Sequence, residues 1–146
     1  MKVLVLHGPN LNLLGRREPE IYGSQSLNDI NIDIEKFGHS LGVVVEAAQS
    51  NHEGELIDRI HNAAESGFVG IIINPGGLTH SSVSLRDAIA AVNIPVVEVH
   101  LTNIHAREEF RQHSFVSPVA VGLVSGFGAV GYQLALKGLL QNISHS

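Results

Sequence analysis

Two kinds of hydrophobic pattern alternate along the chain. Short apolar runs rich in β-branched residues are typical of strands buried on both faces, and they predict strands at residues 3–6, 43–48, 69–73, 95–99 and 119–124. Between them, apolar residues recur every three or four positions, which predicts amphipathic helices at residues 27–41, 52–66, 82–92, 103–111 and 128–141. Five predicted strands therefore alternate with five predicted helices.

Polar residues that can cap a helix precede several of these segments. Ser26, followed by Asp29 three residues later, predicts a capping box at the start of the first helix. Residues 74–77 read Asn-Pro-Gly-Gly and predict a turn in which a glycine takes a positive φ. The N-caps predicted for the second and third helices are Ser50 or Asn51 and Thr79 or Ser81, respectively.

The alternation of strands and helices also predicts how the elements pack. It favours right-handed βαβ units and a parallel sheet with helices on both faces. We therefore expect an α/β, flavodoxin-like fold with five strands, in a single domain over residues 1–146. Ligands of such sheets bind beyond the carboxyl ends of the strands. Polar residues within 7–12, 74–80 and 98–103 should gather at that rim.

The connection after the first predicted strand, residues 7–24, is several times longer than most connections in compact domains. It contains two arginines, two carboxylates, two asparagines and one tyrosine, without apolar periodicity. Such a loop is typical of an active-site lid, which we place at residues 15–24. The alternative is a solvated surface loop in which the charges of Arg16, Arg17 and Glu18 have no function.

Composition excludes several classes of protein. The formal net charge is −5 and the nine basic residues are scattered, which argues against a nucleic-acid-binding surface or an anionic-membrane patch. Cysteine is absent, so disulfides, thiol nucleophiles and cysteine metal ligands are excluded. The first apolar run is far too short for a signal sequence or a membrane span. We expect a cytoplasmic protein with no nucleic-acid or membrane partner.

Two glycine-containing segments invite a nucleotide-binding interpretation. Residues 126–131 match the dinucleotide fingerprint G-x-G-x-x-G. We reject it because the printed sequence ends before the following strand and acidic residue that the fingerprint requires; close helix–sheet packing is the expected role of these glycines. The loop at residues 7–24 lacks the glycines, lysine and hydroxyl of a P-loop.

Titratable residues near the expected rim suggest either a metal site or acid–base chemistry. His80, Glu98, His100 and His105 carry groups that bind divalent ions. No H-x-x-x-H or H-E-x-x-H pair supports such a site, so we expect no metal. Glu98 and His100 are two positions apart and should therefore project from one face at the end of a strand.

Tyr22 lies in a polar loop and not within an apolar pattern. A tyrosine takes a proton only as its phenolate, and a close arginine favours that form. Arg16 and Arg17 lie in the same loop. From the loop alone, a hydrogen-bonded tyrosine that packs the lid is the alternative to a catalytic base.

Several ordered motifs, taken together, resemble those of one enzyme family, the type II 3-dehydroquinate dehydratases. The similarity extends from the first predicted strand to the last helix. The motifs are Gly-Pro-Asn-Leu-Asn-Leu-Leu-Gly at 8–15, Arg-Glu-Pro at 17–19, Tyr-Gly at 22–23, Asn-Pro-Gly at 74–76, Thr-His at 79–80, Leu-Arg-Asp at 85–87, Val-Glu-Val-His at 97–100 and Asn-Ile-His-Ala-Arg-Glu-Glu-Phe-Arg at 103–111.

The resemblance implies the conversion of 3-dehydroquinate to 3-dehydroshikimate by anti elimination of water through an enolate, without metal, cofactor or covalent intermediate. It implies that Tyr22 removes a proton from the carbon next to the ketone and that Arg17 favours the phenolate. His100 would protonate the departing hydroxyl, and Glu98 would set the proton state of His100. Asn10 would stabilise the enolate through a held water.

The resemblance also implies how the substrate is bound. The implied binding set consists of Asn74, His80, Arg111 and the backbone amides of Leu101 and Thr102. The amide pair is expected to open a helix, whose N-terminus suits a carboxylate. Asp87 would reach the site of an adjoining subunit, which implies a homo-oligomer of trimers assembled into a dodecamer.

The lysines fit this family better than the unrelated type I enzymes, which use a lysine Schiff base. Lys2, Lys36 and Lys137 are all expected away from the rim. The chain departs from the family pattern at Leu78, where an aromatic residue is common, at Thr102, where serine is usual, and at Phe115, where tyrosine is frequent.

The reaction occurs both in the shikimate pathway, which supplies chorismate and the aromatic amino acids, and in quinate breakdown. The sequence does not choose between them. Two hypotheses from other classes are a flavodoxin-like module that binds a flavin or nucleotide and an inactive assembly protein of the same fold.

Overall fold

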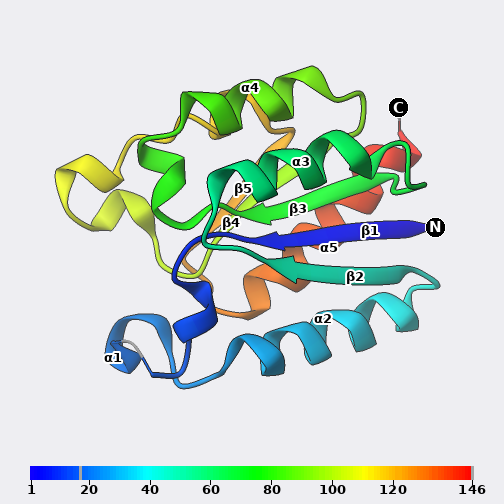
Figure 1. The fold of residues 1–146 in the computed structure, drawn as a ribbon. Helices are drawn as coiled ribbons and strands as arrows, with labels where there is room; N and C mark the ends of the chain where they lie inside the picture. The colour runs from blue at the N-terminus through cyan, green and yellow to red at the C-terminus, as the bar shows by residue number, and fades with distance from the viewer. Residues whose placement is uncertain (17, 146) are drawn as a thin grey trace.

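The computed structural model describes residues 1–16 and 18–145, in which five strands form one parallel sheet. The strand order is β2-β1-β3-β4-β5, which is the flavodoxin-like order. The prediction of an α/β fold with a five-stranded parallel sheet is confirmed (Figure 1). The strands are β1 (Lys2–His7), β2 (Val44–Gln49), β3 (Gly70–Asn74), β4 (Val96–His100) and β5 (Gly122–Ser125).

Helices cover both faces of the sheet, as predicted (Figure 1). Helices α2 and α5 pack on one face, and α3 and α4 pack on the other. The short helix α1 lies within the loop that was predicted to be a lid and was not itself predicted. The α-helices are α1 (Pro19–Tyr22), α2 (Leu27–Ser40), α3 (Glu53–Ala63), α4 (Val83–Ala91) and α5 (Val130–Ser144).

The core consists of two layers, one on each side of the sheet. Along β1, Val3 and Val5 contribute to the layer under α2 and α5, whereas Leu4 and Leu6 contribute to the layer under α3 and α4. All four side chains are buried. Because both faces are covered, successive residues of a strand are all apolar. Burial of each such side chain contributes about 1.5–3 kcal/mol, which explains why the central strands are the most regular apolar runs.

The capping box predicted for α2 is present. Ser26 Oγ accepts a hydrogen bond from the Asp29 amide at 3.1 Å, and Asp29 Oδ2 accepts one from the Ser26 amide at 3.1 Å. The N-cap predicted for α3 is wrong, because His52 occupies that position and neither Ser50 nor Asn51 does. Ser50 Oγ instead accepts a hydrogen bond from the His52 amide at 2.9 Å.

The start predicted for α4 is also wrong. Neither Thr79 nor Ser81 caps this helix, because the chain first forms a 3-10 turn, η2 (Gly76–His80). The N-cap is Ser82, whose hydroxyl accepts a hydrogen bond from the Leu85 amide at 2.9 Å. Gly76 has a φ of 59°, so the predicted turn with a positive-φ glycine is confirmed.

The helix predicted at residues 103–111 is replaced by two 3-10 turns, η3 (Ile104–Ala106) and η4 (Glu109–Arg111). Asn103 Oδ1 accepts a hydrogen bond from the His105 amide at 3.1 Å and closes a single turn. Arg107 then has extended backbone angles, which interrupt any helix. Strand β5 begins later than predicted because a third turn, η5 (Ser117–Val119), precedes it.

The glycines at 126–131 have two different roles. Gly126 has a φ of 98°, a conformation that favours glycine, and it turns the chain from β5 toward α5. Gly131 faces the sheet, where an added Cβ would lie 3.4 Å from Val99 Cγ2 and 3.6 Å from Val124 Cγ1. Close helix–sheet packing is therefore confirmed for Gly131, whereas Gly126 serves the turn. No helix among the described residues is long and apolar enough to cross a membrane.

Candidate active site

A cavity of about 160 Å³ lies beyond the carboxyl ends of β1, β3 and β4. Strand order reverses beside β1, and ligands of open α/β sheets bind at such points. The cavity is small, which suits a ligand built on a single ring. The predicted site residues that line it are Asn10, Tyr22, Asn74, His80, His100, Leu101, Thr102 and Arg111.

Among the described residues, two predicted site residues do not line this cavity. Glu98 lies behind His100 and is completely buried. Asp87 lies exposed on α4. Arg17, the expected partner of Tyr22, lies outside the described residues.

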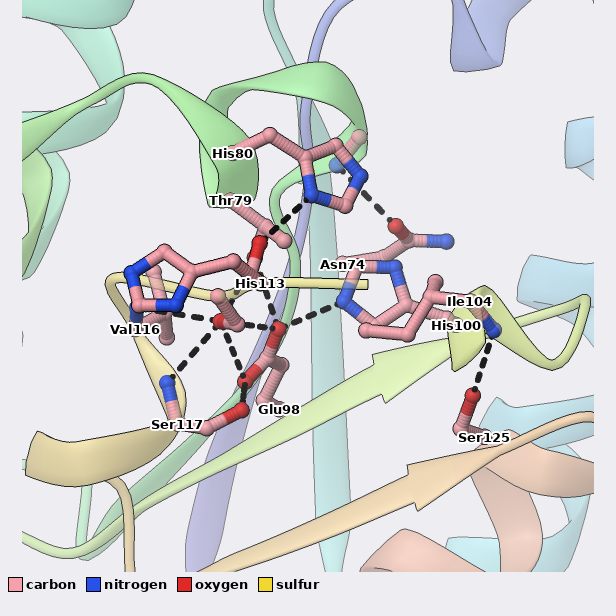
Figure 2. A network of polar contacts seen from close by, with 12 residues as sticks. Asn74, Thr79, His80, Glu98, His100, Ile104, His113, Val116, Ser117 and Ser125 are labelled. Carbon is pink, nitrogen blue, oxygen red and sulfur yellow. Dashed lines mark hydrogen bonds and ion pairs between the residues drawn. The ribbon is translucent and has the colours of Figure 1, made fainter. Parts of the chain in front are cut away.

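Glu98 and His100 form a buried pair at the end of β4, as their spacing predicted. His100 Nε2 and Glu98 Oε2 are 2.5 Å apart (Figure 2). A carboxylate accepts, so Nε2 carries the hydrogen. The other ring nitrogen, Nδ1, is on the opposite side of the imidazole and is left for the cavity that His100 lines.

Three hydroxyl groups that were not predicted also donate to the Glu98 carboxylate (Figure 2). Thr79 Oγ1 and Ser114 Oγ lie 2.6 Å and 3.0 Å from Oε2, and Ser117 Oγ lies 2.5 Å from Oε1. Burial alone would raise the pKa of Glu98, but the hydrogen bonds from His100, Ser117 and Thr79 outweigh it and hold the pKa below its ordinary value. Glu98 is therefore a carboxylate that can stabilise a positive His100.

His80 presents a hydrogen-bond acceptor to the cavity. Its Nδ1 lies 2.8 Å from the carbonyl oxygen of His113 and must donate to it. Burial is the main cause that lowers the pKa of His80, and the nearby charges of His100 and Arg111 act in the same direction. A neutral ring with the hydrogen on Nδ1 leaves a lone pair on Nε2.

Arg107 also lines the cavity, although no role was predicted for it from the sequence. Its Nη1 donates to the Tyr22 hydroxyl oxygen at 2.9 Å, and its Cζ lies 5.3 Å from the centroid of the Tyr22 ring. A guanidinium that donates to a phenol oxygen stabilises the phenolate. Arg107 is part of the motif at 103–111, but its distance of 85 residues from Tyr22 concealed the pairing.

Arg111 adds a second positive group to the cavity wall. Its Nε donates to Glu108 Oε2 at 2.7 Å, which fixes the guanidinium and, as the largest cause, lowers the pKa of Glu108. The guanidinium also lies over the ring of Phe110, 4.9 Å from its centroid. Arginine in a fixed orientation is well suited to a carboxylate ligand.

Asn10 is held in the left-handed region, with a φ of 71°. Asparagine tolerates this conformation better than most residues. The Asn10 amide donates to Asn51 Oδ1 at 2.9 Å, and the side chain of Gln49 donates to the same oxygen at 3.0 Å. Two residues for which no role in the site was predicted, Asn51 and Gln49, thus hold Asn10 at the cavity.

The helix N-terminus expected at Leu101 and Thr102 is not present. Both residues line the cavity, but the segment that follows is the three-residue turn η3. Their amides must act as individual donors, without a helix dipole. Of the departures from the family pattern, Thr102 lines the cavity, whereas Leu78 packs against the core and Phe115 contacts the His113 ring.

Within residues 1–16 and 18–145, no group of three or more histidine, cysteine or acidic side chains is arranged to hold a metal ion. The side chains at the cavity include groups that can transfer protons. Tyr22, next to a guanidinium, can accept a proton, and His100, next to a buried carboxylate, can donate one. Fold and site together define an enzyme that uses general acid–base catalysis on a flavodoxin-like scaffold.

Comparisons with known proteins identify the family. The family model for dehydroquinase class II matches residues 1–140. A 3-dehydroquinate dehydratase of Halothermothrix orenii is 58% identical over 142 residues, which cover 97% of this chain and 95% of that protein. A 3-dehydroquinate dehydratase of Corynebacterium pseudotuberculosis is 57% identical over 148 residues and covers 100% of both chains. The chain belongs to the class II dehydroquinase family.

A solved structure supports the same assignment. The type II dehydroquinase of Butyrivibrio crossotus has a TM-score of 0.94 and 46% sequence identity, and the match covers 96% of this chain and 97% of that one. The expected family and fold class are therefore confirmed. The alternative of a flavin- or nucleotide-binding module is not favoured by these relatives.

Proposed function

We propose that the protein is a type II 3-dehydroquinate dehydratase, which converts 3-dehydroquinate to 3-dehydroshikimate and water in the shikimate pathway. The observation that carries this proposal is that one cavity is lined by both Tyr22, paired with Arg107, and His100, paired with Glu98. The elimination requires one group that takes a proton from carbon and another that gives a proton to the leaving oxygen. The two pairs supply these groups.

In the proposed first step, the Tyr22 phenolate removes a proton from the carbon next to the ketone. Arg107, whose Nη1 lies 2.9 Å from the phenol oxygen, stabilises the phenolate. Arg17 is proposed to contribute a second positive charge to the same oxygen. The C–H electron pair moves into the enolate, whose oxygen is stabilised by a water that Asn10 holds.

In the proposed second step, the enolate expels the hydroxyl on the opposite face, which makes the elimination anti. His100, protonated on both nitrogens, gives its Nδ1 proton to the departing hydroxyl. Glu98 keeps the Nε2 proton in place and balances the charge of the imidazolium. To regenerate the enzyme, Tyr22 then gives its proton to solvent and His100 takes up a proton from solvent.

The remaining cavity residues are proposed to bind the substrate. Arg111 and the amides of Leu101 and Thr102 suit its carboxylate and hydroxyl oxygens, because all three present N–H donors. Asn74 and His80 are proposed to bind hydroxyl groups of the ring. No cofactor takes part in this mechanism.

We propose that residues 1–146 form one catalytic domain in which residues 15–24 act as the lid. Two observations support this role: α1 carries Tyr22 to the cavity, and the residues flanking α1 have positive φ values, 42° at Glu18 and 87° at Gly23. Backbone positions of this kind suit a segment that must close and open over a substrate.

We further propose a cytoplasmic homo-oligomer, a dodecamer built from trimers, in which Asp87 reaches the site of an adjoining subunit. Asp87 is exposed on α4 and free to face another chain. Large exposed apolar residues on and beside β5 and α5 favour burial against a further copy. They are Val121, Leu123, Phe127, Val130 and Leu134.

A continuous ultraviolet assay with 3-dehydroquinate tests the proposed function. The conjugated enone of 3-dehydroshikimate should appear at the same rate with and without a chelator and after borohydride treatment. Tyr22→Phe should abolish turnover while the protein stays folded and oligomeric. Absence of turnover by the folded, unaltered protein would contradict the proposed function, and full activity of Tyr22→Phe would contradict the assigned base.

A further inference from the structure

A buried chain of hydrogen bonds leads from helix α2 to the cavity. It connects Asn31 on α2, His7 at the end of β1, Tyr132 on α5 and Asn74 at the end of β3. The separations are 2.8 Å from Asn31 Oδ1 to His7 Nε2, 2.9 Å from His7 Nδ1 to the Tyr132 oxygen, and 3.1 Å from that oxygen to Asn74 Nδ2. His7, Tyr132 and Asn74 are at most 3% exposed.

The fold explains how four elements meet at this point. His7 and Asn74 are paired in register at the carboxyl ends of the adjacent strands β1 and β3 (Figure 1). Helices α2 and α5 both cover the same face of the sheet, and their side chains reach His7 from that side. Tyr132 lies in the apolar stripe of α5, so the sequence pattern predicts a core residue and does not indicate a role for its hydroxyl group.

The chemistry of the partners sets the direction of each hydrogen bond. Asn31 Oδ1 is an acceptor, so His7 Nε2 carries the hydrogen. Burial lowers the pKa of His7 to about 4, against the opposite effect of its bond to Asn31, and the ring is therefore neutral near pH 7. His7 Nδ1 thus has a lone pair and accepts the hydroxyl hydrogen of Tyr132.

The same reasoning fixes the amide of Asn74. With its hydrogen directed to His7, the Tyr132 oxygen accepts from Asn74 Nδ2. Asn74 Oδ1 in turn accepts from the Gly76 amide at 3.1 Å. A rotated amide would place two acceptors together at Tyr132 and two donors together at Gly76, so only one orientation satisfies the chain.

We propose that His7 and Tyr132 are positioning residues that hold the Asn74 amide, so that its second Nδ2 hydrogen is offered to a hydroxyl or carboxylate oxygen of the substrate. Asn74 lines the cavity, and its other polar groups are engaged by Tyr132 and Gly76. The inference rests on the proposed role of Asn74 in substrate binding. It adds two residues, neither of which lines the cavity, to the set that determines affinity.

A double-mutant cycle with Tyr132→Phe and Asn74→Ala tests the inference. Tyr132→Phe removes one oxygen and keeps the ring, and it should raise KM for 3-dehydroquinate about tenfold, the equivalent of one lost hydrogen bond. Asn74→Ala should raise KM at least as much. Added to Asn74→Ala, Tyr132→Phe should raise KM no further, because it acts only through Asn74.

A second pair of variants covers the case in which Tyr132→Phe does not fold. Asparagine places a polar atom near the position of Nδ1, so His7→Asn should retain most of the affinity, whereas His7→Leu should raise KM about tenfold. Ile89→Val is the matched control, because Ile89 is buried in the opposite core layer. It should lower stability without changing KM.

The possible results distinguish a failure of this inference from a failure of the proposed function. No turnover by the unaltered protein would overturn the proposed function and this inference with it. Unchanged KM in Asn74→Ala would overturn the binding role of Asn74, and hence the positioning role, while leaving the reaction intact. Two results would overturn the positioning role alone. In the first, KM rises in Asn74→Ala but does not change in Tyr132→Phe and His7→Leu. In the second, Tyr132→Phe raises KM by the same factor in the unaltered protein and in Asn74→Ala.

Discussion

At the scale of single residues, the site is built from pairs, each of which joins a reactive side chain to a charged partner by a hydrogen bond. Arg107 donates to the oxygen of Tyr22, and Glu98 accepts from His100. A phenol is a weak base in its neutral form, so a proton-accepting role for Tyr22 requires a group that favours the phenolate. The partners therefore control the rate more than they control binding.

Arg107→Ala should lower kcat for 3-dehydroquinate about 10- to 100-fold with little change in KM. A hydrogen bond to a charged group contributes about 1.5–3 kcal/mol, and this one matters most while the phenolate forms. Steady-state kinetics measure the split between kcat and KM. Arg16→Ala, which removes the same charge from an exposed position in the lid, is the control and should leave kcat unchanged. A pure rise in KM for Arg107→Ala would contradict the role given to it.

Ser117→Ala should shift the acidic limb of the kcat/KM profile to higher pH. The hydroxyl of Ser117 is one of the groups that lower the pKa of Glu98, so its removal raises that pKa and Glu98 loses its charge earlier as pH falls. Ser117→Thr keeps a hydroxyl and should keep the acidic limb in place. An unshifted limb in Ser117→Ala would show that the hydroxyl does not tune the pair.

At the scale of elements, the predictions succeed where burial sets the apolar pattern of a whole element, and they fail where the backbone leaves a regular conformation within a segment of helical composition. The strands are apolar because both faces are covered, and the amphipathic stripe located α2 and α5. The segment at 103–111 has helical composition, yet the turn that Asn103 caps is only three residues long and ends at Arg107, whose backbone is extended. A local sequence pattern does not show where side-chain hydrogen bonds to the backbone replace those of a regular helix.

The site residues also divide into those whose contacts a local sequence pattern predicts and those whose contacts it does not. Glu98 and His100 are neighbours on one strand, so their contact follows from spacing alone. Arg107 and Tyr22 meet only because the sheet brings two loops to one rim, and Tyr132 looks like an ordinary core residue in a helix. Such contacts can be predicted only from the fold, or from a resemblance to a family whose fold is known.

Ser26→Ala should lower the free energy of unfolding by about 1 kcal/mol, because α2 loses the acceptor for the Asp29 amide in its first turn. Urea denaturation at a fixed protein concentration measures the change, since association also affects stability. Ser144→Ala, at the far end of α5, is the control and should change stability by less than about 0.5 kcal/mol. Equal effects of both substitutions would contradict a specific capping role.

At the scale of the whole molecule, buried His7 links stability to pH. Burial lowers its pKa from 6.5 to about 4, so at intermediate pH the unfolded chain takes up a proton that the native state does not. Stability from this group is complete above pH 6.5 and is lost progressively as pH falls toward 4. The difference in pKa corresponds to at most roughly 3 kcal/mol.

His7→Asn should reduce the loss of unfolding free energy between pH 7 and pH 4 by roughly 3 kcal/mol, because asparagine has no proton to bind. Urea denaturation of both proteins at the two pH values measures the difference. His39→Asn, which removes an exposed histidine of α2, is the control and should behave as the unaltered protein. An identical pH dependence in His7→Asn would show that His7 does not determine acid sensitivity.

The place of Tyr132 on α5, C-terminal to the cavity residues, has a consequence for synthesis on the ribosome. The described residues that line the cavity lie between Pro9 and Arg111, so a nascent chain already contains these residues before α5 has been made. The hydroxyl that orients Asn74 arrives only afterwards, when α5 docks on the sheet. The substrate affinity that depends on Asn74 is thus complete only after α5 has left the exit tunnel and packed.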